Sequence, residues 1–235
     1  MLGAGGGRAQ EGPRRLCGLT VPPSAPLAVP PDVTLHTLSS SPGPPAALRQ
    51  ALAAACAGGA GALPLADALA GPEPRLTATL IALNARLRIA GVAVPLEDRL
   101  TVDGRIVPRP DEIIGAVVVP AQPGASCCRE EPDLALGLAA AGSLTGAGDL
   151  ARVTDLRAVW WGVAPAPLIA HQVAGALQGR RPAPALIDIA AQTARGEVQP
   201  AGAGAELDTV RLDAVERLCR DALGALFAIT PAEGG

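Results

Sequence analysis

The sequence predicts an α+β protein in which an α/β unit is followed by a small β-sheet and three helices. Segments with apolar residues at helical spacing alternate with short β-branched runs, and 28 glycines and 24 prolines separate them along the 235 residues. Hydrophobic residues make up 49% of the chain and aromatic residues only 1%. The core must therefore be packed by aliphatic side chains and by close backbone approach.

The first 45 residues predict little regular structure. Residues 1–14 are rich in Gly and Arg, which predicts a flexible N-terminus. The run RLCGLTV, from Arg15 to Val21, has the apolar content of a short strand. Prolines between residues 21 and 45 are too dense for a regular helix or a central strand, so we expect a long loop with at most one short extended piece.

Helix and strand signals begin at residue 46. Ala46–Gly58 follows Pro-Pro, carries an apolar stripe at i, i+4 and i+8, and runs into two glycines, which predicts a helix. A second helix is predicted over Leu76–Asn84. It leads into a strand at RLRIAG, where apolar and arginine residues alternate, and a β-branched strand is predicted over Asp111–Ala121.

The stretch from residue 121 to 133 is polar and holds two prolines, which predicts a linker with a domain boundary at residues 122–132. Beyond it, Leu134–Leu144 and Ala151–Ala164 predict an antiparallel hairpin across the turn TGAGD. Three amphipathic helices are predicted over residues 166–179, 183–198 and 207–228. The second unit therefore has the order β-β-α-α-α.

Trp160 and Trp161 are the only tryptophans and stand side by side at the end of a predicted strand. Neighbouring side chains in a strand point to opposite faces of the sheet. We expect one ring to fill the core between the small sheet and its helices. The other ring should face the adjacent unit or the mouth of a pocket.

Composition and charge exclude several functions. The formal net charge is -3, with 19 Lys+Arg against 22 Asp+Glu, and no basic run is present. Nucleic acid is therefore not an expected partner. No window reaches about 18 uninterrupted apolar residues, and no apolar signal segment opens the chain. These features predict a cytoplasmic protein without a membrane span.

The cysteines and histidines do not form a recognisable metal or disulfide pattern. The five cysteines (Cys17, Cys56, Cys127, Cys128 and Cys219) are odd in number and contain no C-x-x-C, and His36 and His171 lie in different predicted units. We expect no bound metal. His171 is interpreted as a surface or capping residue of its helix.

Residue chemistry alone identifies no catalytic residue. No G-x-S-x-G motif is present, and the adjacent carboxylates Glu130 and Glu131 are expected to remain solvated. The vicinal pair Cys127–Cys128 leaves two alternatives open. Arg129 could lower a thiol pKa and make it reactive, or the pair could be an incidental feature of the linker.

Three stretches resemble the flavin-binding medium subunits of molybdenum hydroxylases, the family of carbon monoxide and xanthine dehydrogenases. The run TLIALNARLRIAG followed by VPLEDRLTVDGRIVPRPDEIIGAVVVPA is similar to the family's helix-strand run. WGVAPAPLIAHQVAGALQGR is similar to its Gly-Gly-Val-Ala-Pro-Thr-Pro segment, with Trp161 at the first glycine. The β-β-α-α-α order resembles its C-terminal domain. Together the matches cover about residues 15–228.

The resemblance also has departures at the cofactor-binding segments. The family holds the FAD diphosphate with two glycine-rich loops, and we expect the first to be absent because RLCGLTV resembles the strand that follows it. The second loop, Gly-Thr-Ile-Gly-Gly-Asn in the family, aligns with GALPLA, residues 61–66. Pro64 has no N–H and Leu65 adds bulk. A family Asp is replaced by Arg75.

The resemblance implies a truncated, partial FAD-binding-type domain over residues 15–121 and a C-terminal domain over residues 133–230. It places the cofactor contacts at Gly61, Ala62 and Leu63. It implies an oxidoreductase subunit that transfers electrons through FAD, with large molybdopterin and small iron–sulfur subunits as partners. Two alternatives stay open: an FAD-free scaffold or assembly subunit, and a crevice reused for a small apolar substrate.

Overall fold

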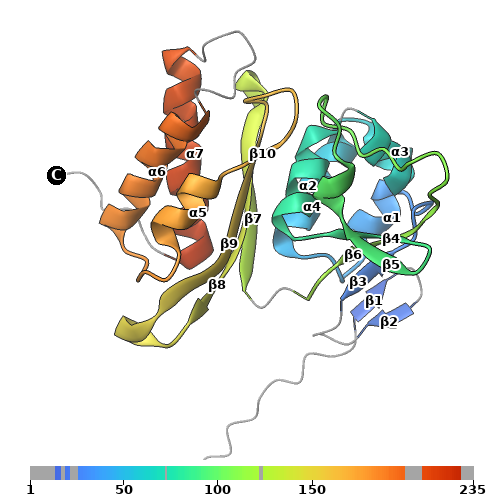
Figure 1. Ribbon diagram of the computed structural model, residues 1–235, viewed down its shortest axis with the longest axis horizontal. Helices are drawn as coiled ribbons and strands as arrows, with labels where there is room; N and C mark the ends of the chain where they lie inside the picture. Colours follow the sequence, from blue (N-terminus) through green and yellow to red (C-terminus); the bar gives the residue numbers. More distant parts are fainter. Residues whose placement is uncertain are drawn as a thin grey trace, which may run out of the picture.

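The computed structural model describes residues 14–16, 19–21, 26–71, 73–121, 124–198 and 208–228, and for the first two ranges it describes only the backbone. The predicted flexible N-terminus, apart from Arg14, and Cys17 lie outside these residues. Two four-stranded antiparallel sheets and the helices packed on them form the molecule (Figure 1). A separate pair of three-residue strands lies near the start of the chain.

The described helices are α1 (Leu35–Ser39), α2 (Ala46–Ala57), α3 (Leu65–Ala70), α4 (Pro74–Ala82), α5 (His171–Leu177), α6 (Pro184–Val198) and α7 (Thr209–Phe227). The described strands are β1 (Arg14–Leu16), β2 (Leu19–Val21), β3 (Leu27–Val29), β4 (Arg86–Ile89), β5 (Val92–Pro95), β6 (Ile114–Val119), β7 (Ala125–Glu131), β8 (Leu136–Thr145), β9 (Arg152–Trp161) and β10 (Leu168–Ile169). Short 3-10 turns are η1 (Ala60–Ala62), η2 (Leu96–Arg99), η3 (Pro132–Leu134) and η4 (Gly148–Leu150).

The N-terminal sheet has the strand order β3-β6-β4-β5. In β4, Leu87 and Ile89 are buried while Arg86 and Arg88 are exposed, so the predicted alternation is confirmed. The predicted helices at residues 46–58 and 76–84 are confirmed as α2 and α4. Both helices carry a buried apolar face that belongs to the same core as β4 and β6.

The C-terminal sheet has the strand order β10-β9-β8-β7 and lies between two sets of helices. Helices α5 and α7 contact one face, with α6 packed against both of them, and α2 and α4 contact the other face (Figure 1). The predicted hairpin is confirmed as β8 and β9, which pair antiparallel. Because helices cover both faces, neither face of its central strands has to be polar.

Successive side chains of β8 and β9 enter two different cores. Trp161, with 4% of its surface exposed, packs in the core that contains α2 and α4. Trp160 is fully buried in the core formed with α5, α6 and α7. The same alternation separates Ala139 from Ala140 in β8. The prediction that the two indole rings occupy opposite faces is therefore confirmed.

Three local predictions were wrong. The run Arg15–Val21 is not one strand, because β1 and β2 pair antiparallel within it. The Pro-rich loop contains a helix, α1, whose first turn is capped by the Thr34 hydroxyl accepting from the Thr37 N–H at 3.3 Å. The helix predicted from residue 166 begins at His171 instead, since Leu168–Ile169 adds an edge strand to β9.

The predicted linker was also wrong, because most of it forms strand β7. This strand pairs with β8 from Ala125 to Glu131 and forms an edge of the C-terminal sheet. Two hydrogen bonds join it to α2. The Ser126 hydroxyl accepts from the Ala47 N–H at 3.2 Å, and the Gln50 side-chain oxygen accepts from the Cys128 N–H at 2.7 Å.

The vicinal cysteines occupy opposite faces of β7 and are both buried. Cys127 Sγ lies 3.4 Å from the Ala222 carbonyl oxygen in the C-terminal core, whereas Cys128 packs in the other core beside Thr79. Burial raises the pKa of Cys127 to about 11 and that of Cys128 to about 12, and the Arg129 charge offsets only part of the effect at Cys127. The reactive-thiol alternative is therefore wrong.

Replacing Gly137 by Ala is expected to destabilise the protein. An added methyl group would overlap the Trp161 ring and lie 2.5 Å from the Arg129 carbonyl oxygen. We expect a loss of about 2 kcal/mol in the free energy of unfolding, measured by urea denaturation. Gly175→Ala is the matched control, because that α5 glycine has open space around it and should be neutral or stabilising. Equal effects of the two changes would contradict the close approach of Gly137 and Trp161.

Cys127 and Cys128 should resist alkylation at pH 8 in the folded protein, because their raised pKa values keep the thiols protonated and buried. Peptide mapping after iodoacetamide treatment should find the half-buried Cys56 modified before the buried Cys127, Cys128 and Cys219. In denaturant all these thiols should react. Above pH about 9 the unfolded chain loses thiol protons that the folded chain keeps, so the free energy of unfolding should fall as pH rises.

Candidate functional site

The segment aligned with the cofactor loop, residues 61–66, is a compact turn rather than an open loop. Gly59, with φ +92°, precedes the 3-10 turn η1, and Leu65 begins α3. The Leu63 N–H donates to the Ala60 carbonyl at 3.0 Å. The Leu65 and Ala66 N–H groups donate to the Val33 and Pro31 carbonyls, each at 2.9 Å.

These hydrogen bonds bear on whether the segment fits a diphosphate. A phosphate cradle needs several backbone N–H groups that point at the ligand. In residues 63–66, three N–H groups are already engaged by carbonyls and Pro64 has none. Gly61 and Ala62 lie in η1, and the Leu63 side chain is 42% exposed. The segment does not fit a diphosphate cradle, and cofactor contact by Gly61, Ala62 and Leu63 stays a prediction.

Ion pairs join α4 and η2 to the C-terminal sheet at its two ends. At one end Arg75, at the start of α4, pairs with Glu130 of β7. At the other, Arg157 Nη2 of β9 lies 2.8 Å from Glu97 Oε2 in η2. All four side chains are 27–29% exposed. Glu130 was expected to be solvated, and that prediction was wrong because the strand brings it to Arg75.

A cavity of about 310 Å³ lies beside Trp161 at the Arg75 end of the sheet. Its walls include the end of α2 and the start of α4, together with Glu73, Glu130 and Glu131. Glu131 is paired with Arg217 of α7. The lining is therefore rich in charged groups. It differs from the apolar pocket expected for a crevice reused by a small apolar substrate.

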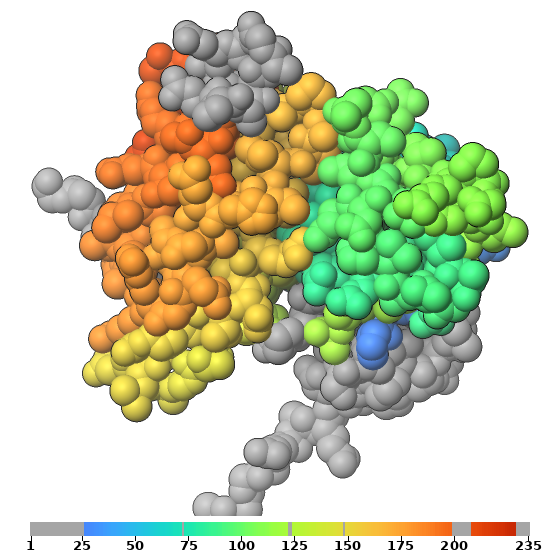
Figure 2. All heavy atoms as spheres, viewed as in Figure 1, coloured from blue at the N-terminus to red at the C-terminus, as the bar shows by residue number. Residues whose placement is uncertain are grey.

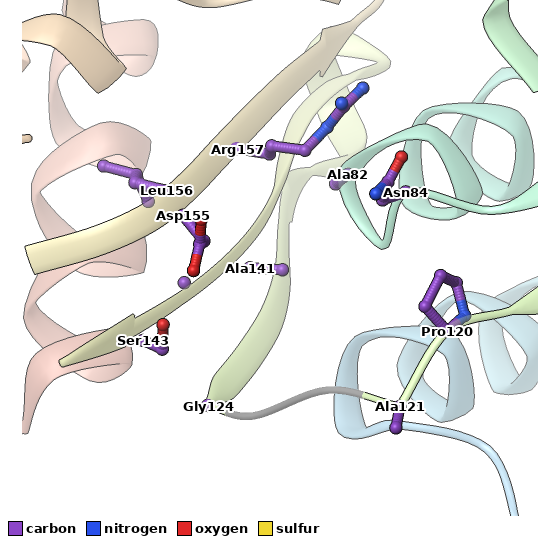
Figure 3. A pocket seen from close by; sticks show the side chains of 11 residues that line it. Ala82, Asn84, Pro120, Ala121, Gly124, Ala141, Ser143, Asp155, Leu156 and Arg157 are labelled. Atoms are coloured by element: carbon purple, nitrogen blue, oxygen red, sulfur yellow. The ribbon is translucent and has the colours of Figure 1, made fainter. Parts of the chain in front are cut away.

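A larger cavity, of about 390 Å³, lies at the opposite end of the sheet. Figure 3 shows Ser143 and Asp155 on the β8–β9 side and Asn84 at the end of α4 across the gap. Pro120 and Ala121 follow β6 and form the lower wall. Asp155 has φ +52° at a bulge, because Ala141 pairs with Arg157 while Ser143 pairs with Thr154.

The structure offers no metal site within the described residues, since no group of three or more His, Cys, Asp or Glu side chains converges there. His36 is exposed on α1, and His171 is exposed at the start of α5 as predicted. Among the helices of the described ranges, none has both the length and the apolar character needed to cross a bilayer.

Apart from Trp161, for which a position facing the adjacent unit or a pocket mouth was predicted, sequence reasoning missed the residues that line the two cavities. Each cavity combines α4 with strands from the other sheet, and only the register of β7, β8 and β9 brings these segments together. One local signal was available: Asp155 interrupts the apolar alternation of VTDLRAVWW. In Figure 2 the green segments of the first half and the yellow and orange segments of the second meet along one junction.

Comparison with known proteins adds three solved structures that have this fold. Carbon monoxide dehydrogenase from Hydrogenophaga pseudoflava, lacking its Mo-pyranopterin moiety, is 19% identical with a TM-score of 0.62, covering 94% of this chain and 79% of its own. Reconstituted CO dehydrogenase from Oligotropha carboxidovorans is 19% identical with a TM-score of 0.64, covering 94% and 80%. Quinoline 2-oxidoreductase from Pseudomonas putida 86 is 17% identical with a TM-score of 0.65, covering 88% and 77%.

A search of curated proteins finds no match. The family described as CO dehydrogenase flavoprotein C-terminal domain matches residues 126–226. That range begins in β7 and ends in α7, so it contains the C-terminal sheet and its three helices except for Ala125 and Phe227. Residues 126–226 therefore match the C-terminal domain of the CO dehydrogenase flavoprotein family, and the chain over its described length has the fold of these three solved structures.

Proposed function

We propose that this chain is a subunit of a molybdenum-hydroxylase-type oxidoreductase and works in complex with a molybdopterin-bearing chain and an iron–sulfur chain. The observation that carries the proposal is the C-terminal sheet with its three helices, which matches the family over residues 126–226. The described residues contain no cluster of metal-ligating side chains, so redox centres would come from partner chains.

We also propose the division of the chain into a flavin-type unit over residues 15–121 and a C-terminal unit over residues 133–230. The two separate sheets support this division. Strand β7, Ala125–Glu131, lies between these two bounds and pairs with β8 of the C-terminal unit. The cytoplasm is the compartment that we propose, because the four described cysteines are free thiols.

One observation supports a second candidate, an FAD-free scaffold subunit. The N–H groups of Leu63, Leu65 and Ala66 are satisfied within the fold, so residues 61–66 do not need a ligand to complete their hydrogen bonds. The interface between α2, α4 and the C-terminal sheet is likewise closed by protein contacts, including Trp161. Such a subunit would contribute its surfaces to the assembly without holding a flavin.

Partner binding can be tested by co-expression with a molybdopterin-type subunit and an iron–sulfur-type subunit from the same genome. We expect one complex in gel filtration that contains all three chains. Arg217→Ala, which breaks the Glu131 pair on the surface, serves as a control for general loss of solubility. A chain that elutes alone as a monomer in the presence of both partners would contradict the proposal.

Cofactor binding can be tested on the purified chain by visible absorption and by titration with FAD. Because residues 61–66 do not offer a diphosphate cradle, we expect a colourless protein that does not take up FAD by itself. Retention of FAD after desalting would contradict the scaffold candidate. If Ala62→Pro then abolished that retention, the predicted contacts at Gly61, Ala62 and Leu63 would be supported.

A further inference from the structure

We propose that the cavity beside Asp155 binds a small organic cation with an amidinium or ammonium group. The cavity has a volume of about 390 Å³ and is formed jointly by α4, β8, β9 and the segment after β6. This size lies within the range of sites that bind small molecules. The proposal goes beyond the subunit function, because this cavity lies at the opposite end of β7 and β8 from Arg75 and Trp161.

The charge of the cavity comes from one carboxylate. Arg157 also lines it, but its guanidinium is paired with Glu97 at 2.8 Å, so these two charges offset each other. Asp155 has no hydrogen bond or ion pair from its side chain to another described residue. Glu97 lies outside the lining, but because it neutralises Arg157, Asp155 is left as the unpaired charge at the cavity, which favours a cationic ligand.

The backbone at Asp155 explains how this carboxylate reaches the cavity. Two residues of β9, Asp155 and Leu156, stand opposite Gly142 of β8, and this bulge interrupts the alternation. Leu156 is buried in the C-terminal core, whereas Asp155 is exposed. Its φ of +52° is a conformation that Gly, Asn and Asp adopt more easily than other residues. Of these three, only Asp adds a charge.

Neighbouring groups define the shape that a ligand must have. The Asn84 side chain lies across the gap from Asp155, and Ala82, Pro120 and Ala141 supply apolar walls (Figure 3). The Ser143 hydroxyl is engaged with Thr154 at 2.8 Å and helps to fix the strand beside the bulge. A flat apolar body with a cationic fork can contact these walls while donating to both carboxylate oxygens.

Benzamidine and its neutral analogue benzamide test the proposal on the full chain. Amide chemical shifts in two-dimensional ¹H–¹⁵N NMR should move on adding benzamidine, first at Asn84, Gly142 and Asp155, with a dissociation constant of roughly 1 mM. Benzamide should bind at least about tenfold more weakly, since it lacks the charge. Binding of benzamide as tight as that of benzamidine would overturn the proposal, as would no shift at these residues up to about 10 mM of probe.

Three variants locate the effect. Asp155→Asn keeps the shape and the positive φ but removes the charge, and Asp155→Gly removes the side chain while also permitting that φ. Both should weaken benzamidine binding roughly tenfold. Asp133→Asn is the matched control, because Asp133 is exposed at the opposite end of the β7–β8 hairpin and lines neither cavity. Wild-type affinity in Asp155→Asn would refute the assignment.

Discussion

The C-terminal sheet is buried on both faces, so its strands must supply side chains to two hydrophobic cores. A strand places successive side chains on opposite faces, and here helices bury both faces of β8 and β9. Buried strands of this kind read as nearly continuous apolar runs, as LGLAAAGS does in β8. The organisation of the two halves, the place of the tryptophans and the cavities at both ends of the junction all depend on this sheet.

Small side chains make the shared sheet possible. Alanines 139, 140 and 141 and Ala158 are buried in β8 and β9, where larger residues would hold the helices away. Gly137 leaves room for the Trp161 ring on the paired position of β9. The Trp161 ring, packed against Gly137, thus fills a volume for which this chain has few other large side chains. At the sheet ends, where the packing opens, charged pairs replace apolar contacts.

The parts of the fold that the sequence predicted are those with a local signal. Helices α2 and α4, the β8–β9 hairpin and the opposite faces of Trp160 and Trp161 follow from spacing and alternation within one segment. Strand β7 was missed because Arg129, Glu130 and Glu131 make it polar. The ion-pair partners of the two glutamates, Arg75 and Arg217, lie far away in the sequence. The cavities depend on the same long-range pairing. Helix α1 was missed because the surrounding prolines outweighed the Thr34 cap.

The alternation between two cores makes the chain sensitive to changes of length. Inserting or deleting one residue near the start of β9 would exchange the positions of Trp160 and Trp161, because strand periodicity is two. Every strand residue after the change would face the opposite core, so both cores would receive side chains of the wrong size. A substitution changes the packing at one position only. A one-residue shift of the strand register moves every following side chain of the strand to the other face. Indels during the divergence of such chains should therefore be confined to turns such as residues 146–151, while the lengths of the central strands stay constant.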